Sequence, residues 1–247
     1  MLSRLLRIST CLTLGFLAAA PTHAQESSWT VHPFAEGGWS FPLMNLGKNV
    51  ADIQLQTALQ TVASIEGSPV MAAGVEVVFP DGNMRFRGEF RTTVGATARA
   101  LLGLCESGEL AKPGVGLCAI VERADARVTD GDVGLILSLG QAEHRIRPLA
   151  WVGLGLRSYD FDSDLSECDG YSDDSLEICR RSREIFENPS VTALLTFGTG
   201  LEARLDPVSA FVRLSAVASS YSGGGGRANG GRQVDLVLTG GLGLRVR

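Results

Sequence analysis

Aromatic and charged residues are both scarce in this chain of 247 residues, at 6% and 20% of the sequence. Histidine, tryptophan and tyrosine each occur 3 times. Hydrophobic residues make up 45%, which excludes a disordered chain that is too polar to build a core. The net charge of −5 argues against nucleic acid as the main partner. The 30 glycines follow no three-residue period, which excludes collagen.

A long apolar run is also missing beyond residue 24, so no stretch of about 20 residues predicts a transmembrane helix there. One shorter apolar run spans residues 11–20, after two arginines, and leads to Thr22-His23-Ala24. Small residues in this arrangement are typical of a secretory signal that is cut after Ala24. We therefore predict a cleaved signal peptide over 1–24 and one domain over 25–247. The signal holds two arginines and no acidic residue, so its removal leaves 223 residues with a net charge of −7.

Alternation of apolar and polar residues dominates the remaining chain and predicts strands with two different faces. It is clearest near the end, where Leu236, Leu238 and Leu242 fall on one face and Asp235 and Thr239 on the other. The segment with most charge places Met84, Phe86, Phe90, Ala96 and Ala98 opposite Arg85, Arg87, Glu89, Arg91 and Arg99. Eight segments show the pattern, near 30–41, 70–79, 84–99, 131–140, 147–159, 190–204, 208–221 and 233–247.

The connections between these segments alternate in length. Short ones lie near 80–83, 141–146 and 205–207, and long ones near 42–69, 100–130, 160–189 and 222–231. Strict alternation is typical of barrels that cross an outer membrane, with short periplasmic turns and long external loops. A soluble β-sandwich with its apolar face inward gives no reason for it. The polar face also carries glycines beside arginines, as a narrow lumen requires: Gly95, Gly134, Gly153, Gly155, Gly198, Gly200, Gly241 and Gly243.

With these features, the whole of 25–247 resembles the small eight-stranded outer-membrane β-barrels of the OmpA/OmpX type. The likeness is one of pattern, and the chain ends in Leu244-Arg245-Val246-Arg247 where that family usually has a final aromatic residue. The resemblance implies an all-β fold, an eight-stranded antiparallel transmembrane up-and-down β-barrel with short periplasmic turns and long external loops. It implies a place in the bacterial outer membrane, contact with its lipid and lipopolysaccharide, insertion by the barrel insertion machinery, and a monomer.

A barrel of eight strands is just wide enough for side chains to fill its interior. Buried charges must be paired, so we expect a lumen plugged by a network of arginines and acidic residues. Its predicted members are Glu36, Glu76, Arg85, Arg87, Glu89, Arg91, Arg99, Asp132, Arg157, Glu202, Arg204, Arg213, Asp235 and Arg245. The predicted role is structural, or surface interaction through external loops. Two alternatives stay open: a narrow channel or small or apolar-solute transport barrel similar to OmpW, and a soluble exported β-sandwich or lipocalin-like binder.

Four cysteines follow the signal: Cys105, Cys118, Cys168 and Cys179. An even number in an exported chain predicts disulfides, and pairing within each loop is the simplest of three arrangements. Their spacing is unlike a zinc site, so we expect no metal and no cofactor there.

Three further features concern the loops and catalysis. Asp160, Asp162 and Asp164 resemble the start of a calcium loop, but the glycine and the final glutamate of such a loop are missing. A solvated loop is therefore expected, with calcium as the alternative. Residues 50–65 fit either a short amphipathic helix or an extended hairpin. His32 and His144 fall near short turns and share no recognisable spacing with a serine and an acid, so we predict no enzymatic activity.

Overall fold

The computed structural model describes residues 29–44, 46–51, 59–80, 82–103, 119–140, 144–162, 186, 190–221, 229–230 and 232–246. Its strands are β1 (Thr30–Pro42), β2 (Gly47–Ala51), β3 (Leu59–Ile65), β4 (Ser68–Val78), β5 (Met84–Thr93), β6 (Ala96–Gly103), β7 (Ala119–Ser138), β8 (Ile146–Asp162), β9 (Ser190–Arg204), β10 (Val208–Ser220), β11 (Asn229–Gly230) and β12 (Arg232–Leu244). Among these residues, no helix is long and apolar enough to cross a membrane.

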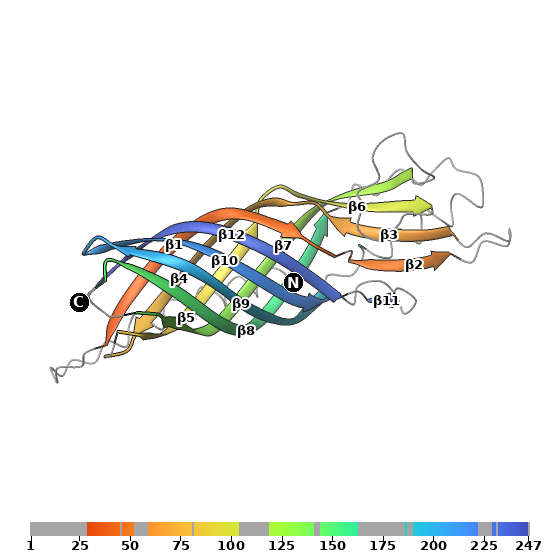
Figure 1. The fold of residues 1–247 in the computed structure, drawn as a ribbon. Helices are drawn as coiled ribbons and strands as arrows, with labels where there is room; N and C mark the ends of the chain where they lie inside the picture. The colour runs from red at the N-terminus through yellow and green to blue at the C-terminus, as the bar shows by residue number, and fades with distance from the viewer. Residues whose placement is uncertain are drawn as a thin grey trace, which may run out of the picture.

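Eight of the strands close into an antiparallel barrel in the order β1-β4-β5-β7-β8-β9-β10-β12 (Figure 1). The ladder that closes it pairs β12 with β1, from Phe34↔Gly243 to Pro42↔Asp235. Each strand pairs with the barrel strands before and after it in the sequence, which defines an up-and-down barrel. Short turns connect β4 to β5, β7 to β8 and β9 to β10 at the end that also holds the C-terminus, which we call the turn end. The predicted fold class is confirmed.

The outer face of the barrel is apolar on all eight strands. Large side chains such as Met71, Leu154 and Val191 are 63%, 65% and 66% exposed. Along the outward positions of β7 and β8, away from the turn end, the first charged residues among the described ones are Arg127 and Asp160, which pair with each other in the ladder. They mark the end of the apolar band. Water-soluble monomers rarely expose an apolar surface of this extent, whereas a barrel in lipid requires one. The inside-out alternation expected from the sequence is therefore present.

Beyond the apolar band, part of the sheet continues past the barrel mouth (Figure 1). This projection, which we call the wing, consists of β2, β3, β6, β11 and the first part of β7. It lies mostly in stretches in which the sequence predicts long connections, near 42–69, 100–130 and 222–231, although β6 begins within the segment 84–99 that is predicted as a strand. The reason is that outward positions there need no longer be apolar: on β7 they become Arg123, Asp125 and Arg127, all exposed. In the first of these stretches β2 pairs with β3, so an extended hairpin is correct for 59–65 and the helix is wrong there.

A one-residue bulge separates the barrel from the wing. Strand β7 runs unbroken beside both β5 and β6, pairing at Thr92↔Thr129 and then at Ala96↔Ala126. Between these two pairs the chain advances four residues from Thr92 to Ala96 but only three residues along β7. One extra residue on one side of a ladder defines a β-bulge. Gly95 lies in it with φ +62°, a conformation that glycine adopts without strain.

The bulge corrects three expectations for the segment 84–99. An offset of one residue exchanges the two faces of a strand. Ala96 and Ala98, expected on the outside, are therefore inward and 2% and 0% exposed. Arg99, expected in the lumen, lies on the opposite face of the wing, where it forms an ion pair with Glu66. Gly95, expected on the lumen face, belongs to the bulge itself.

Inward glycines bring neighbouring backbones close enough to leave no room for a side chain. A Cβ atom on Gly198 would lie 2.4 Å from the carbonyl oxygen of Leu214 and 2.4 Å from Trp151, whereas a Cβ atom on the outward Gly88 would meet nothing within 4 Å. We expect Gly198→Ala to lower the free energy of unfolding by about 1–3 kcal/mol through overpacking. Gly88→Ala is the matched control and should have little effect. Urea unfolding of both variants in detergent micelles measures the difference, and equal effects would contradict the steric explanation.

Candidate functional site

Most of the charged residues that the structure describes in the lumen form one continuous alternating chain of six arginines and six carboxylates, and every barrel strand contributes at least one member. We call it the ion chain. In order from the turn end it runs Arg204, Glu202, Arg85, Glu76, Arg213, Glu36, Arg87, Glu89, Arg91, Asp130, Arg157 and Asp235. Because each cation lies beside carboxylates on both sides along the chain, apart from the terminal Arg204, the charge cancels locally. This pairing is what buried ions require.

At the turn end, Arg85 joins two carboxylates from opposite parts of the barrel. Its Nη1 donates to Glu76 Oε2 at 2.9 Å and to Glu202 Oε1 at 2.7 Å, and its Nη2 donates to Ser138 Oγ at 3.2 Å. The side chain is 1% exposed. Arg204 continues the chain outward from Glu202, with its Nε 3.5 Å from the carboxylate.

In the middle, aromatic rings flank the guanidinium groups. Arg213 donates to Glu36 Oε2 at 3.2 Å and to Glu76, and its guanidinium carbon lies 3.9 Å from the centre of the Phe211 ring. The guanidinium groups of Arg87 and Arg213 both lie over Phe34, at 5.0 and 5.1 Å. Cation–π contacts of this kind stabilise a desolvated charge beyond its ion pairs.

At the other end, Arg157 forms the best geometry of the chain. Its Nε and Nη2 donate to the two oxygens of Asp130 at 2.7 and 2.9 Å, and its Nη1 donates to Asp235 at 2.5 Å. A two-point contact of this type is the strongest arginine–carboxylate pairing. Arg91 connects Glu89 to the same Asp130. Its Nη2 lies 2.6 Å from Glu89, and its Nη1 lies 3.7 Å from Asp130.

Three residues predicted for the lumen lie outside the ion chain. Arg99 is in the wing, as described above. Arg245 lies at the turn end, where its Nη1 is 3.5 Å from the exposed Asp206. Asp132 faces inward from β7 and accepts a hydrogen bond from Thr196 at 3.0 Å.

Among the residues that the structure describes, two buried charged ones are absent from the list predicted from the sequence. Asp130 is 4% exposed and links Arg91 to Arg157. It lies on the same face of β7 as Asp132, but the predicted segment began at residue 131, one residue too late. Arg147 is 0% exposed and donates to the Gly82 carbonyl at 2.9 Å and to Asn83 Oδ1 at 2.5 Å, so it fastens β8 to the turn between β4 and β5.

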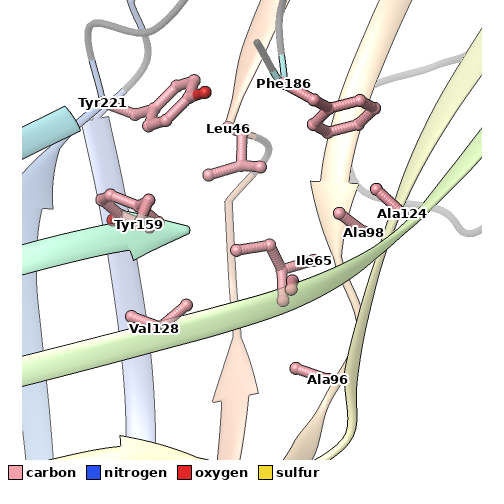
Figure 2. Packing of buried hydrophobic residues seen from close by; sticks show 10 residues of the cluster. Leu46, Ile65, Ala96, Ala98, Ala124, Val128, Tyr159, Phe186 and Tyr221 are labelled. Carbon is pink, nitrogen blue, oxygen red and sulfur yellow. The ribbon is translucent and has the colours of Figure 1, made fainter. Parts of the chain in front are cut away.

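An apolar cluster covers the mouth of the barrel at the wing end (Figure 2). We call it the apolar cap. It consists of Leu46, Ile65, Ala96, Ala98, Ala124, Ala126, Val128, Tyr159, Phe186 and Tyr221. Phe186 is 3% exposed, and its ring lies 5.1 Å from that of Phe161, which packs against the cap. Burial raises the pKa of the Tyr221 phenol, so this group stays neutral. No sequence pattern predicts the cap as a cluster. Most of its residues come from segments expected to be loops or outward faces, whereas Tyr159 and Tyr221 end predicted strands, on the polar face that the sequence assigns to the lumen.

The remaining predicted sites have little structure to describe. Cys105, Cys118, Cys168, Cys179 and Asp164 lie outside the described residues, as does the predicted signal peptide. Asp160 and Asp162 are described and exposed. Within the described ranges, no three residues among His, Cys, Asp and Glu come together as a metal site.

The two histidines of the predicted domain lie near the turn end. His32 is 6% exposed, and its Nε2 lies 3.1 Å from the hydroxyl of Thr30. His144 is exposed beside the start of β8.

A closed up-and-down barrel with an apolar outside and a charged inside is the architecture of transmembrane β-barrel proteins. The chain is an eight-stranded β-barrel of this class. No family model and no curated protein matches its sequence. Among solved structures, it is similar to the N-terminal β-barrel domain of OprF from Pseudomonas aeruginosa, with 10% identity over 88% of this chain and 97% of that one, at a TM-score of 0.41.

Two further solved structures are similar to this chain. The outer membrane protein OprG from Pseudomonas aeruginosa shares 14% identity over 87% of this chain and 96% of its own, at a TM-score of 0.45. The attachment invasion locus protein Ail of Yersinia pestis, solved with the heparin analogue sucrose octasulfate, shares 12% identity over 87% and 99%, at a TM-score of 0.35. The fold itself rests on the closed strand pairing of this chain.

Proposed function

We propose that this protein is a non-enzymatic outer-membrane β-barrel with a plugged lumen, which acts as a structural element or presents its wing and loops to a partner. The ion chain is the observation that carries the proposal. Ions would have to break buried ion pairs to pass, and each break costs several kcal/mol. The cavities at the two ends of the chain are each about 10 Å³, close to the room that one water molecule needs.

The proposal includes the orientation and processing of the chain. A signal peptide over 1–24 is removed, the turn end lies in the periplasm, and the wing lies outside the cell among lipopolysaccharide. The protein is a monomer that the barrel insertion machinery delivers. The apolar band supports a place in the membrane, and the wing supports an interaction role because it extends β-sheet beyond the band.

Disulfides within the external loops complete the proposal. Strands β6 and β7 pair at Leu102↔Ala119, so the chain ends on either side of residues 104–118 are neighbours. This supports a bond between Cys105 and Cys118, with Cys168 and Cys179 as the second pair. Mass mapping of peptides without reduction tests the pairing, and a link between the two loops would contradict it.

Planar bilayer recording separates the plugged barrel from the channel alternative. We expect the purified, folded protein to give no steady open conductance, because the ion chain spans the lumen and its charges cancel. An open porin added to the same bilayer is the positive control. Steady conductance steps from this protein would overturn the plugged lumen and favour the channel. Membrane fractionation tests the second alternative, because extraction from cell envelopes without detergent would indicate a soluble sandwich or binder.

A further inference from the structure

A small cavity lies between the ion chain and the apolar cap. Ile65, Val128 and Tyr159 of the cap line it, and so do Arg91 and Asp130 of the ion chain. Its volume is about 10 Å³. It is therefore the place where the charged interior of the barrel meets the apolar closure of its mouth.

Three polar atoms of residues lining this cavity have no hydrogen-bond partner among the described residues: Ser68 Oγ, Arg91 Nη1 and Gln233 Oε1. These residues are 2%, 3% and 1% exposed. Leaving a buried polar group unsatisfied is costly. Partners are therefore expected at the cavity, because three such atoms around one space would otherwise destabilise the barrel at a single point.

The orientation of each group defines what a guest must offer. Gln233 Nε2 donates to the Met44 carbonyl at 2.9 Å, which fixes the amide so that Oε1 is an acceptor. Arg91 Nη1 is a donor, and Oδ2 of Asp130 lies 3.7 Å from it, beyond hydrogen-bond range. The Ser68 hydroxyl can serve as either. A guest must therefore accept from Arg91 and donate to Gln233.

The charge around the cavity indicates a neutral guest. Arg91 and Arg157 line it together with Asp130 and Asp235, so the two cations and two carboxylates balance. Neither an anion nor a cation would find a surplus of opposite charge, and an unpaired ion pays a large desolvation cost in such a place.

The cavity lies beside the bulge, at the wing end of β4 and β5. Ser68 begins β4 and Thr93 ends β5, and both residues line the cavity. Thr93 Oγ1 is occupied by the backbone N–H of Val128 at 2.9 Å. Ser68 and Thr93 thus occupy the end positions on the inward faces of β4 and β5, beside the bulge, and two small polar side chains leave space that larger ones would fill.

We propose that this cavity is a specific site for one uncharged, water-sized hydrogen-bonding molecule, namely a water molecule that bridges Arg91, Gln233 and Ser68. It ties the end of the ion chain to β12 and to the start of β4. Closed over by the apolar cap, the molecule exchanges slowly with solvent. The site goes beyond the proposed function, since it does not depend on what the wing binds.

A crystal structure of the full folded chain at about 2 Å resolution tests the site directly. We expect one density peak within about 3.2 Å of all three polar atoms. Parallel soaks in rubidium and bromide salts distinguish a neutral guest from an ion, because both ions scatter anomalously. Featureless density at the cavity, or an anomalous peak from either soak, would overturn the proposal.

A solution experiment tests slow exchange and uses a matched pair of serines. Ser68→Val fills the cavity, whereas Ser215→Ala alters another inward serine, 3% exposed on β10, that does not line it. Folding of both is checked by heat-modifiable gel migration. Oxygen-17 relaxation dispersion should count one long-lived water fewer in Ser68→Val than in the wild type and no change in Ser215→Ala. An unchanged number of long-lived water molecules in folded Ser68→Val would contradict the proposal. If that variant does not fold, the crystal structure of the wild-type protein decides.

Discussion

Replacing Glu76 with glutamine is expected to lower the free energy of unfolding by about 3–5 kcal/mol, the usual cost of breaking a buried ion pair from one side. Glu76 is 3% exposed and accepts hydrogen bonds from both Arg85 and Arg213. The amide keeps the shape of the side chain but removes the negative charge between two guanidinium groups. Urea titration in detergent micelles, with the folded fraction read from gel migration, measures the loss.

The wing offers a matched control for this prediction. Glu66 forms an ion pair with Arg99, and its side chain is 30% exposed. Glu66→Gln should therefore cost less than about 1 kcal/mol, as is typical of solvent-exposed pairs. Equal losses in the two variants would mean that burial of the ion chain contributes nothing, which would contradict its role as a plug that holds the barrel together.

An arginine in the middle of the apolar band is expected to lower stability in a bilayer by about 2–4 kcal/mol. Val152 on β8 is 52% exposed and lies about midway between Ile146, where the strand begins, and Ser158, where the band ends. In Val152→Arg, the new charge would face the hydrocarbon core, where no water or partner can solvate it. Unfolding of protein folded into lipid vesicles measures the effect.

Depth in the membrane is the control for this second prediction. Ser158→Arg places the same side chain on the same outward face of β8, two residues before the charged Asp160. Near the interface the cost should fall to about 0–1 kcal/mol. If both variants were equally stable in vesicles and in micelles, the apolar band would not be a lipid-facing surface.

The alternation in the sequence predicts the faces of the barrel strands, but not which charges meet. On β12, alternate residues from Gln233 to Thr239 are all buried, as their spacing predicts, because a strand has a period of two. The order of the ion chain is different. Arg85 on β5 reaches Glu202 on β9 across the lumen, and such contacts depend on the tilt and stagger of the strands, which no local pattern contains.

The errors in the prediction have equally local causes. Ala96 and Ala98 were assigned to the wrong face because a single extra residue beside Gly95 shifts the register, and alanine fits either side of a strand. Asp130 was missed because the start of β7 carries charge on its outer face, which hides the alternation used to find strands. The same cause explains why the wing and the apolar cap were not predicted. Outside the lipid, a strand does not need the alternation of apolar and polar residues by which strands are recognised in the sequence.

The cancellation along the ion chain has a consequence for encounters with other molecules. Six cations and six anions that alternate over short distances produce almost no field beyond the barrel wall. The whole net charge, −5 for the full chain and −7 after the proposed removal of residues 1–24, is therefore carried by residues outside that chain, and many acidic residues lie between 160 and 177. At a distance, this net negative charge attracts basic molecules and repels anionic ones. Salt should weaken this long-range selection, because its range is about 8 Å at physiological ionic strength.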